Sequence, residues 1–411
     1  MKDYDLITLS NGIRIVHKQV LHTQIVHCGI FLDIGSRDET PVYQGIAHFW
    51  EHMAFKGTRK RKSFHILNSI DALGGELNAF TDKEKIVFHA SVRQRYVDKA
   101  IELLADITFD SIFPENQIER ERNVILEEMA MYQDDPDDSL FDEFDHVVFG
   151  NHPMGLNILG TPDTVKSFRR KDFKNFIRKN ISTDRVVFAS TGSMSAEKIF
   201  MLAEKYLALV PKLMTESKRL PLEKYKAKEI ELYRSVNQAR CAIGRTAFPI
   251  KHQQRLPFFM LMNILGGPFM NSKLNLALRE KRGFVYAVDA SYTAYSDTGI
   301  FGIFFGTEPA RLDKSVQLVL REMQELMDKP LSSRKLATAK EQIKGQLALM
   351  EENNQGLMLM MGRSVIDTGK VPSFEAVEQR ILDIEADELQ NLAQKMFAPA
   401  KLSILKMLPQ N

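Results

Sequence analysis

The sequence predicts an α+β protein of two homologous domains, each with a mainly antiparallel sheet covered by helices on one face. The first observation behind this prediction is length, because 411 residues exceed what one hydrophobic core usually supports. The second is that the same order of strand and helix patterns occurs in both halves of the chain. The third is a polar, lysine-rich segment over residues 211–229, which contains two prolines and separates the halves.

The first half opens with alternating apolar residues over 13–36, a pattern typical of strands. A histidine-bearing helix is expected next, followed by a helix over 63–75, strands over 78–92 and two long helices. The second half repeats this order, from an opening strand to two closing helices. Its expected strands and helices lie at residues 241–250, 257–267, 273–283, 285–295 and 299–307, before the closing pair.

Short matching segments indicate a duplication. The segment YVDKAIELLADI, which starts at Tyr96, resembles RLDKSVQLVLREM, which starts at Arg311, and the two cysteines fall at corresponding places in the opening strands. Ordered matches at a similar offset are typical of a repeat. We therefore predict an N-terminal domain over residues 1–215, which contains the closely spaced histidines His48 and His52, and a related C-terminal domain over 220–411, which lacks such a pair.

Composition and charge exclude several classes of function. The formal net charge is +2 and the basic residues are dispersed among acids, so no concentrated basic surface is available for nucleic acid. No run of apolar residues approaches membrane-spanning length and the polar start lacks the core of a signal peptide, so we expect a cytoplasmic protein without a membrane partner. Cys28 and Cys241 are too few for a disulfide framework and are expected to be buried, reduced thiols.

The segment GIAHFWEHMAFKGT contains two histidines and a glutamate within five positions: His48, Glu51 and His52. Residues three and four apart share one face of a helix, so these side chains can point into one cavity. Two imidazoles one turn apart can bind a single zinc ion, and Glu51 can accept a proton from the attacking water. The alternative is an ordinary solvated helix face, but this spacing favours a metal site.

A third ligand must come from another element, because catalytic zinc normally takes three protein ligands. The glutamate-rich helix pattern over residues 115–136 offers Glu119, Glu121, Glu127 and Glu128. Glu121 and Glu128 are seven positions apart and share a face, so one can bind metal while the other supports the site. The spacing leaves the choice open, and a charged solvent face remains an alternative for this helix.

Four segments that occur in order along the chain resemble the pitrilysin-type zinc metallopeptidases, which have an inverted HxxEH motif. These are HFWEHMAFKGT, GGELNAFTDKE, ERERNVILEEMAMYQDDP and LREKRGFVYAVDASY. The resemblance covers nearly the whole chain and is to the short branch that includes mitochondrial processing peptidase. It implies that His48 and His52 bind zinc and that Glu51 is the general base. It also implies that the third ligand is Glu128 and that Glu121 supports the site from behind.

The resemblance implies substrate-binding residues in both halves. Asn78 and Ala79 match the edge strand on which this family binds peptide as an added strand. Arg279 and Tyr286 match a pair that holds the substrate carbonyl as water adds. Outside the family context, the Asn78 segment would be only a turn into a strand and Arg279 one of several exposed charges.

The implied function is that of a zinc-dependent endopeptidase with one Zn2+ per chain, which hydrolyses short or unstructured peptides. The resemblance also implies a homodimer that closes into a clamshell chamber, with a heterodimer that includes an inactive homologue as the alternative. A second function remains open, that of a noncatalytic partner or scaffold subunit of a processing-peptidase-like complex. Such subunits typically lose ligands or the base, and this chain retains them.

Overall fold

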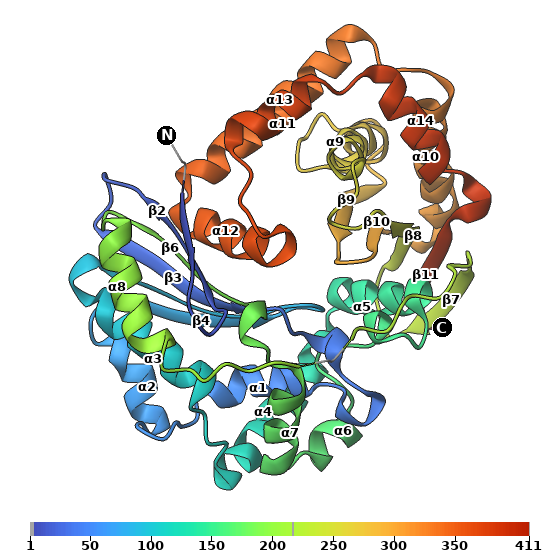
Figure 1. The fold of residues 1–411 in the computed structure, drawn as a ribbon. Helices are drawn as coiled ribbons and strands as arrows, with labels where there is room; N and C mark the ends of the chain where they lie inside the picture. Colours follow the sequence, from blue (N-terminus) through green and yellow to red (C-terminus); the bar gives the residue numbers. More distant parts are fainter. Residues whose placement is uncertain (1–3, 216–217, 411) are drawn as a thin grey trace. The chain divides into compact units, whose positions relative to one another are not determined.

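The computed structural model describes residues 4–215 and 218–410 (Figure 1). Contacts divide the chain into two compact units, which are described separately. The first comprises Met1–Ala130, Leu156–Arg219 and Ala348–Ser373, and the second comprises Met131–Gly155, Leu220–Leu347 and Phe374–Asn411. Each half of the chain therefore contributes one segment to the unit formed mainly by the other half, and the division into residues 1–215 and 220–411 stays a prediction. Within the described ranges, no helix has the length and apolar character needed to cross a membrane.

The first unit contains a six-stranded sheet in the order β1-β2-β6-β3-β5-β4. Neighbouring strands are antiparallel except for the parallel pair of β2 and β6. Strand β4 lies at one edge of this sheet, next to β5. The strands are β1 (Asp5–Thr8), β2 (Arg14–Gln19), β3 (Ile25–Leu32), β4 (Glu76–Thr81), β5 (Ile86–Arg93) and β6 (Val186–Gly192).

The second unit contains a five-stranded sheet in the order β7-β11-β8-β10-β9. Its neighbouring strands are antiparallel except for the parallel pair of β7 and β11. The order and directions match those of β2-β6-β3-β5-β4 in the first sheet, so β9 takes the edge position that β4 holds. The strands are β7 (Glu229–Arg234), β8 (Ala239–Ala247), β9 (Val285–Ala294), β10 (Gly299–Thr307) and β11 (Ser403–Pro409).

Helices also recur in the same order, which confirms the predicted α+β class with two related domains. The first unit runs from β3 through α1 (Ile46–Ala54) and α2 (Ser63–Asp71) to β4, β5 and α3 (Val97–Phe109). The second runs from β8 through α9 (Arg255–Gly266) and a π-helix (Asn275–Glu280) to β9, β10 and α10 (Leu312–Asp328). Each unit also has a helix from the other half of the chain, which the repeated order alone did not predict.

The first sheet is covered on both faces. Helices α1, α3 and α8 (Ala196–Leu207) pack on one face, and α12 (Asn354–Thr368) lies on the opposite face against β3 and β6 (Figure 1). Alternation along β3 places Cys28 and Ile30 in the core between the sheet and α1. Trp50 of α1 is fully buried in the same core, with its ring 6.3 Å from that of Phe88.

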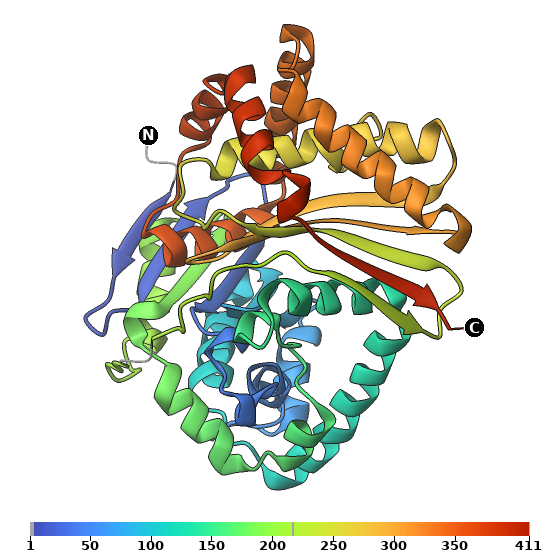
Figure 2. The same cartoon turned by 90° about the vertical axis from the view of Figure 1, so that its right-hand side faces the viewer.

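The second sheet has a similar arrangement. Helix α9 packs against β9 on one face together with α10 and α14 (Ala386–Met396), while α5 (Pro136–Phe149) packs against β8 and β11 on the other (Figure 2). Cys28 in β3 and Cys241 in β8 are free and fully buried. Burial raises the pKa of the Cys28 thiol to about 12, so it is uncharged at neutral pH. The expectation of buried thiols is confirmed.

Substitution of Gly362 in α12 tests how tightly this helix is packed on the first sheet. An added Cβ would lie 2.4 Å from the ring of Phe31, which is fully buried and cannot move aside. We expect Gly362→Ala to lower the free energy of unfolding by about 1–3 kcal/mol, measured by urea denaturation.

The matched control is Gly345→Ala in α11 (Ser333–Glu352), where a Cβ meets nothing within 4 Å. This change should raise the free energy of unfolding by up to about 1 kcal/mol, because alanine favours a helix more than glycine does. Equal destabilisation by both substitutions would contradict the packing.

Candidate metal centre

Helix α1 has a fixed starting point. Gly45 precedes it with φ of +93°, a left-handed conformation that favours glycine, and a Cβ there would lie 2.4 Å from the carbonyl oxygen of Leu159. The buried carboxylate of Glu39 accepts hydrogen bonds from the backbone N–H groups of Gly45 and Ala47, both at 2.8 Å. A carboxylate in this place also interacts favourably with the helix dipole. These contacts fix the helix that carries the histidines.

Helix α1 separates apolar from ionisable side chains. Phe49 and Trp50 are fully buried in the core, whereas Glu51 and His52 are half-buried and His48 is 8% exposed. The rings of His48 and His52 lie with their centroids 4.6 Å apart. The helical spacing therefore brings the two imidazoles together, as the sequence predicts.

Helix α4 (Glu115–Asp134) brings a carboxylate to the two imidazoles. Glu128 places one oxygen 3.6 Å from Nε2 of His48 and the other 3.4 Å from Nε2 of His52. Ligand atoms of these three residues all lie within 4.8 Å of one another. Glu127, the preceding residue, is exposed. The geometry therefore distinguishes Glu128 from Glu127, a choice that the spacing of charges left open.

This donor set fits zinc. Two ligand atoms that are each about 2.1 Å from a tetrahedral zinc ion lie roughly 3.4 Å apart, which matches the separations between Glu128 and the two histidines. The same separations are longer than ordinary hydrogen bonds. Two imidazoles and one carboxylate also leave a fourth position for water, as in catalytic rather than structural zinc sites.

Burial controls the charges at the centre. Burial and the neighbouring His52 lower the pKa of His48 to about 3, so its imidazole is neutral at pH 7 and keeps a lone pair for a metal. Burial raises the pKa of Glu51, against the opposing effect of a hydrogen bond from Thr81. Burial also raises the pKa of Glu128, and His52 opposes this effect.

Lys56 and Thr81 support the centre, and the sequence did not predict either of them. Glu121, the predicted supporting residue, lies 3.3 Å from Nδ1 of His52 and forms an ion pair with Lys56 at 2.7 Å. Burial favours a raised pKa for Glu121, but the hydrogen bonds from His52 and Lys56 outweigh it and its pKa is lowered. The hydroxyl of Thr81 donates to Oε2 of Glu51 at 2.6 Å. The sequence signal for the role of Lys56 is its position four residues after His52.

The predicted substrate-binding residues lie on β4. Asn78 is exposed and its side-chain oxygen accepts a hydrogen bond from the backbone N–H of Ala79 at 2.8 Å. Ala79 is half-buried and packs against the core of the first unit. Because β4 is an edge strand, its far side is open to pairing with an extended peptide.

The predicted pair in the second unit is also assembled. Arg279 lies in the π-helix and Tyr286 at the start of β9, and the guanidinium carbon lies 5.8 Å from the centroid of the phenol ring. Tyr286 is 89% exposed. The side chain of Arg279 is 40% exposed, so both side chains can be reached by a ligand at this edge of the second sheet.

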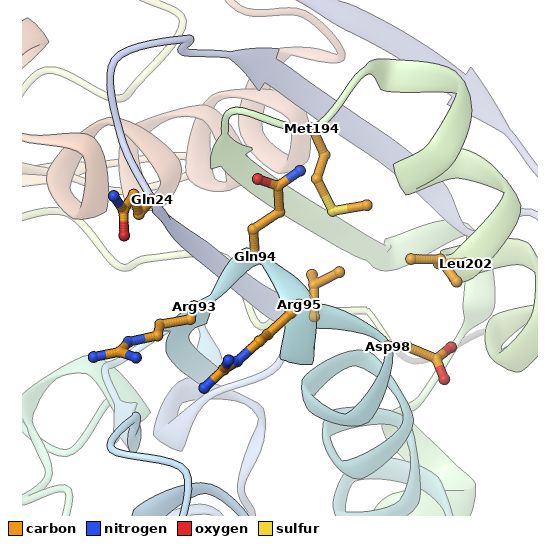
Figure 3. Close-up of a pocket in the computed structure, with 8 residues that line it drawn as sticks. Gln24, Arg93, Gln94, Arg95, Asp98, Met194 and Leu202 are labelled. Carbon is orange, nitrogen blue, oxygen red and sulfur yellow. The ribbon is translucent and has the colours of Figure 1, made fainter.

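A pocket elsewhere in the first unit contains none of the predicted site residues (Figure 3). It is lined by Arg93, Gln94 and Met194, among others, at the far end of β5 from the metal centre. The candidate centre is therefore defined by its ionisable side chains rather than by this pocket.

Comparison with known proteins identifies the family of the chain. The family described as Insulinase (Peptidase family M16) matches residues 14–162, and the one described as Peptidase M16 inactive domain matches residues 167–343. An uncharacterized zinc protease of Bacillus subtilis, YmxG, is 32% identical over 392 residues, or 95% of each chain. One from Rickettsia felis is 31% identical and covers 98% of this chain and 97% of its own. The mitochondrial-processing peptidase subunit beta of Saccharomyces cerevisiae is 30% identical over 93% of this chain and 86% of its own.

Solved structures show the same fold. A peptidase M16 inactive domain from Pseudomonas fluorescens has a TM-score of 0.92 at 18% identity, covering 99% of this chain and 98% of its own. A protease from Helicobacter pylori has a TM-score of 0.91 at 21% identity, covering 99% of both chains. These matches confirm the predicted family resemblance. The zinc protease relatives named above and the ligand set of His48, His52 and Glu128 confirm the expectation of zinc. The chain belongs to the insulinase family, peptidase family M16.

Proposed function

We propose that this chain is a zinc endopeptidase that hydrolyses short or unstructured peptides. The observation that carries the proposal is the convergence of His48, His52 and Glu128 on one point. Glu51 lies on the same helix and its carboxylate is oriented by Thr81. Membership of a peptidase family supports the same reaction. A noncatalytic scaffold subunit would have no need of both the ligand set and the base.

The proposed mechanism assigns one step to each group. When bound by His48, His52 and Glu128, zinc would supply a Lewis acid for the scissile carbonyl and lower the pKa of the attacking water. The carboxylate of Glu51 accepts the proton from that water and passes it to the leaving amine. Thr81 holds Oε2 of Glu51 during both transfers. Glu121 orients His52 through Nδ1, which supports the ligand from behind.

The edge of β4 binds the peptide as an added strand in this proposal. Backbone hydrogen bonds along β4 would hold an extended chain with little regard to its side chains. We assign this role to the segment around Asn78 and Ala79, since Asn78 is exposed at the open edge. Strands of a folded protein are already paired, so we expect a preference for unstructured peptides.

Arg279 and Tyr286 are assigned to the substrate carbonyl on the strength of the resemblance. A guanidinium and a phenol together can stabilise the negative oxygen that develops as water adds. Their mutual contact and exposure support this assignment. Kinetics of an Arg279→Ala variant at matched zinc content test it, and an unchanged kcat would contradict it.

Assembly into a homodimer with an enclosed chamber is part of the proposal. A chain that holds both the metal ligands and the Arg279 and Tyr286 pair needs no specialised partner. The yeast relative is a beta subunit by name, so a heterodimer is the alternative. Light scattering on the purified chain tests the dimer, and a monomer at working concentration would contradict it. The cytoplasmic location stays a prediction.

Substitution of Glu128 tests the ligand assignment. We expect Glu128→Gln to weaken zinc binding by more than about 100-fold, because the change removes a charged ligand, with affinity measured against a competing chelator. The control is Glu127→Gln, an identical change at the exposed neighbouring position, which should leave the affinity unchanged. Similar losses in both variants would refute the assignment.

Substitution of Glu51 tests the base. Glu51→Gln should retain one zinc per chain and lower kcat for peptide cleavage by about 100- to 10,000-fold, since the amide cannot accept the proton. Chelation should abolish cleavage by the wild-type protein, and added zinc should restore it. Full activity in the Glu51→Gln variant would show that another group is the base.

A further inference from the structure

The two faces of β4 differ in what they offer to a bound peptide. Leu77 and Ala79 point into the core of the first unit. Because side chains alternate along a strand, Asn78 and Phe80 lie on the opposite face, where Asn78 is paired in register with His89. On this second face, α12 covers the inner strands β3 and β6. A peptide paired with β4 would present every second side chain to it.

Helix α12 places a positive charge beside Phe80. The guanidinium carbon of Arg363 lies 5.1 Å from the centroid of the Phe80 ring, and the Arg363 side chain is exposed. The helix is held there by close packing of Gly362 on the buried ring of Phe31 and by Gln355, whose amide lies 3.5 Å from the ring of His89. The position of Arg363 is therefore set by the packing of α12 on the sheet.

This charge lies close to the proposed site of cleavage. Thr81 follows Phe80 on β4 and donates to the carboxylate of Glu51. Each residue of a strand advances by about 3.3 Å, so a peptide residue paired with Phe80 is within about two residues of the bond on which Glu51 acts.

Two acidic residues in this region, Asp367 and Glu76, leave the guanidinium charge of Arg363 unneutralised. Asp367, one turn further along α12, is paired with Lys85 at 2.8 Å. Glu76 shares the exposed face of β4 but is four positions from Phe80, about 13 Å along the strand. A guanidinium that rests on an aromatic ring can still donate from its edge to a carboxylate.

We infer that Phe80 and Arg363 form a substrate subsite that selects an acidic side chain, Asp or Glu, at the peptide position paired with Phe80. This inference rests on the proposed peptidase function and adds a preference that backbone pairing with β4 cannot supply. The guanidinium of Arg363 binds the carboxylate, and the Phe80 ring packs against the aliphatic part of the same side chain.

The test uses pairs of unstructured peptides that differ only in Glu or Gln at one position on either side of the cleaved bond. All peptides are amidated, so that a C-terminal carboxylate cannot provide the charge. For the zinc-loaded wild-type protein we expect kcat/KM to be about three- to tenfold higher with Glu at one position. Binding of the same peptides to the Glu51→Gln variant, measured by fluorescence anisotropy, provides a readout independent of cleavage.

The variants separate the subsite from general effects of charge. Arg363→Gln should reduce the Glu to Gln ratio to about one, Arg363→Lys should keep part of it, and Arg363→Glu should reverse it in favour of Gln. The control is Arg93→Gln, which removes an exposed arginine and should keep the wild-type ratio. Arg93 is the last residue of β5, whereas Phe80 pairs with Val87 near the start of that strand (Figure 3).

Two results would overturn the subsite while leaving the peptidase intact. One is zinc-dependent cleavage with no preference for Glu at any position, and the other is a preference that persists in Arg363→Gln. Failure of the wild-type protein to cleave any peptide would instead overturn the proposed function and the subsite with it.

Discussion

The convergence of α1 and α4 on one carboxylate and two imidazoles is the constraint on which the proposed chemistry depends. Three ionisable groups within 4.8 Å of one another are costly to bury without a cation between them. The surrounding residues reduce that cost. Glu39 and Gly45 fix the start of α1, and Lys56 neutralises Glu121 behind His52. The site is therefore supported by contacts at the start of α1 and by the charge of Lys56 beside Glu121.

Duplication of the fold did not duplicate the site. Helix α9 holds the place in the second unit that α1 holds in the first, yet its sequence RLPFFMLMNILG has no histidine or carboxylate. It buries residues that include Phe258 and Leu261 instead. The edge strands show the same division, because β4 lies beside the metal helix whereas β9 carries Tyr286. One copy contains the candidate metal ligands, and the other contains the contacting pair of Arg279 and Tyr286.

The sequence predicted those features that depend on local spacing. The histidine pair follows from helical periodicity, and the repeated order of elements predicted two related sheets. Glu128 needed the family resemblance, because the four candidate glutamates of α4 cannot be told apart by sequence until α4 is placed beside α1. The exchange of α5 and α12 between units was not predictable, since hydrophobic patterns show that a helix packs but not on which sheet. For the same reason Arg363 could not be connected with Phe80.

X-ray absorption at the zinc edge of the purified, zinc-loaded chain is the most direct test of this account. Elemental analysis should give about one zinc per chain, and the spectrum should show scattering from two imidazole rings and otherwise only oxygen neighbours. A sulfur neighbour, a shell without imidazole, or zinc that washes away from the wild-type chain would contradict the assignment of the centre.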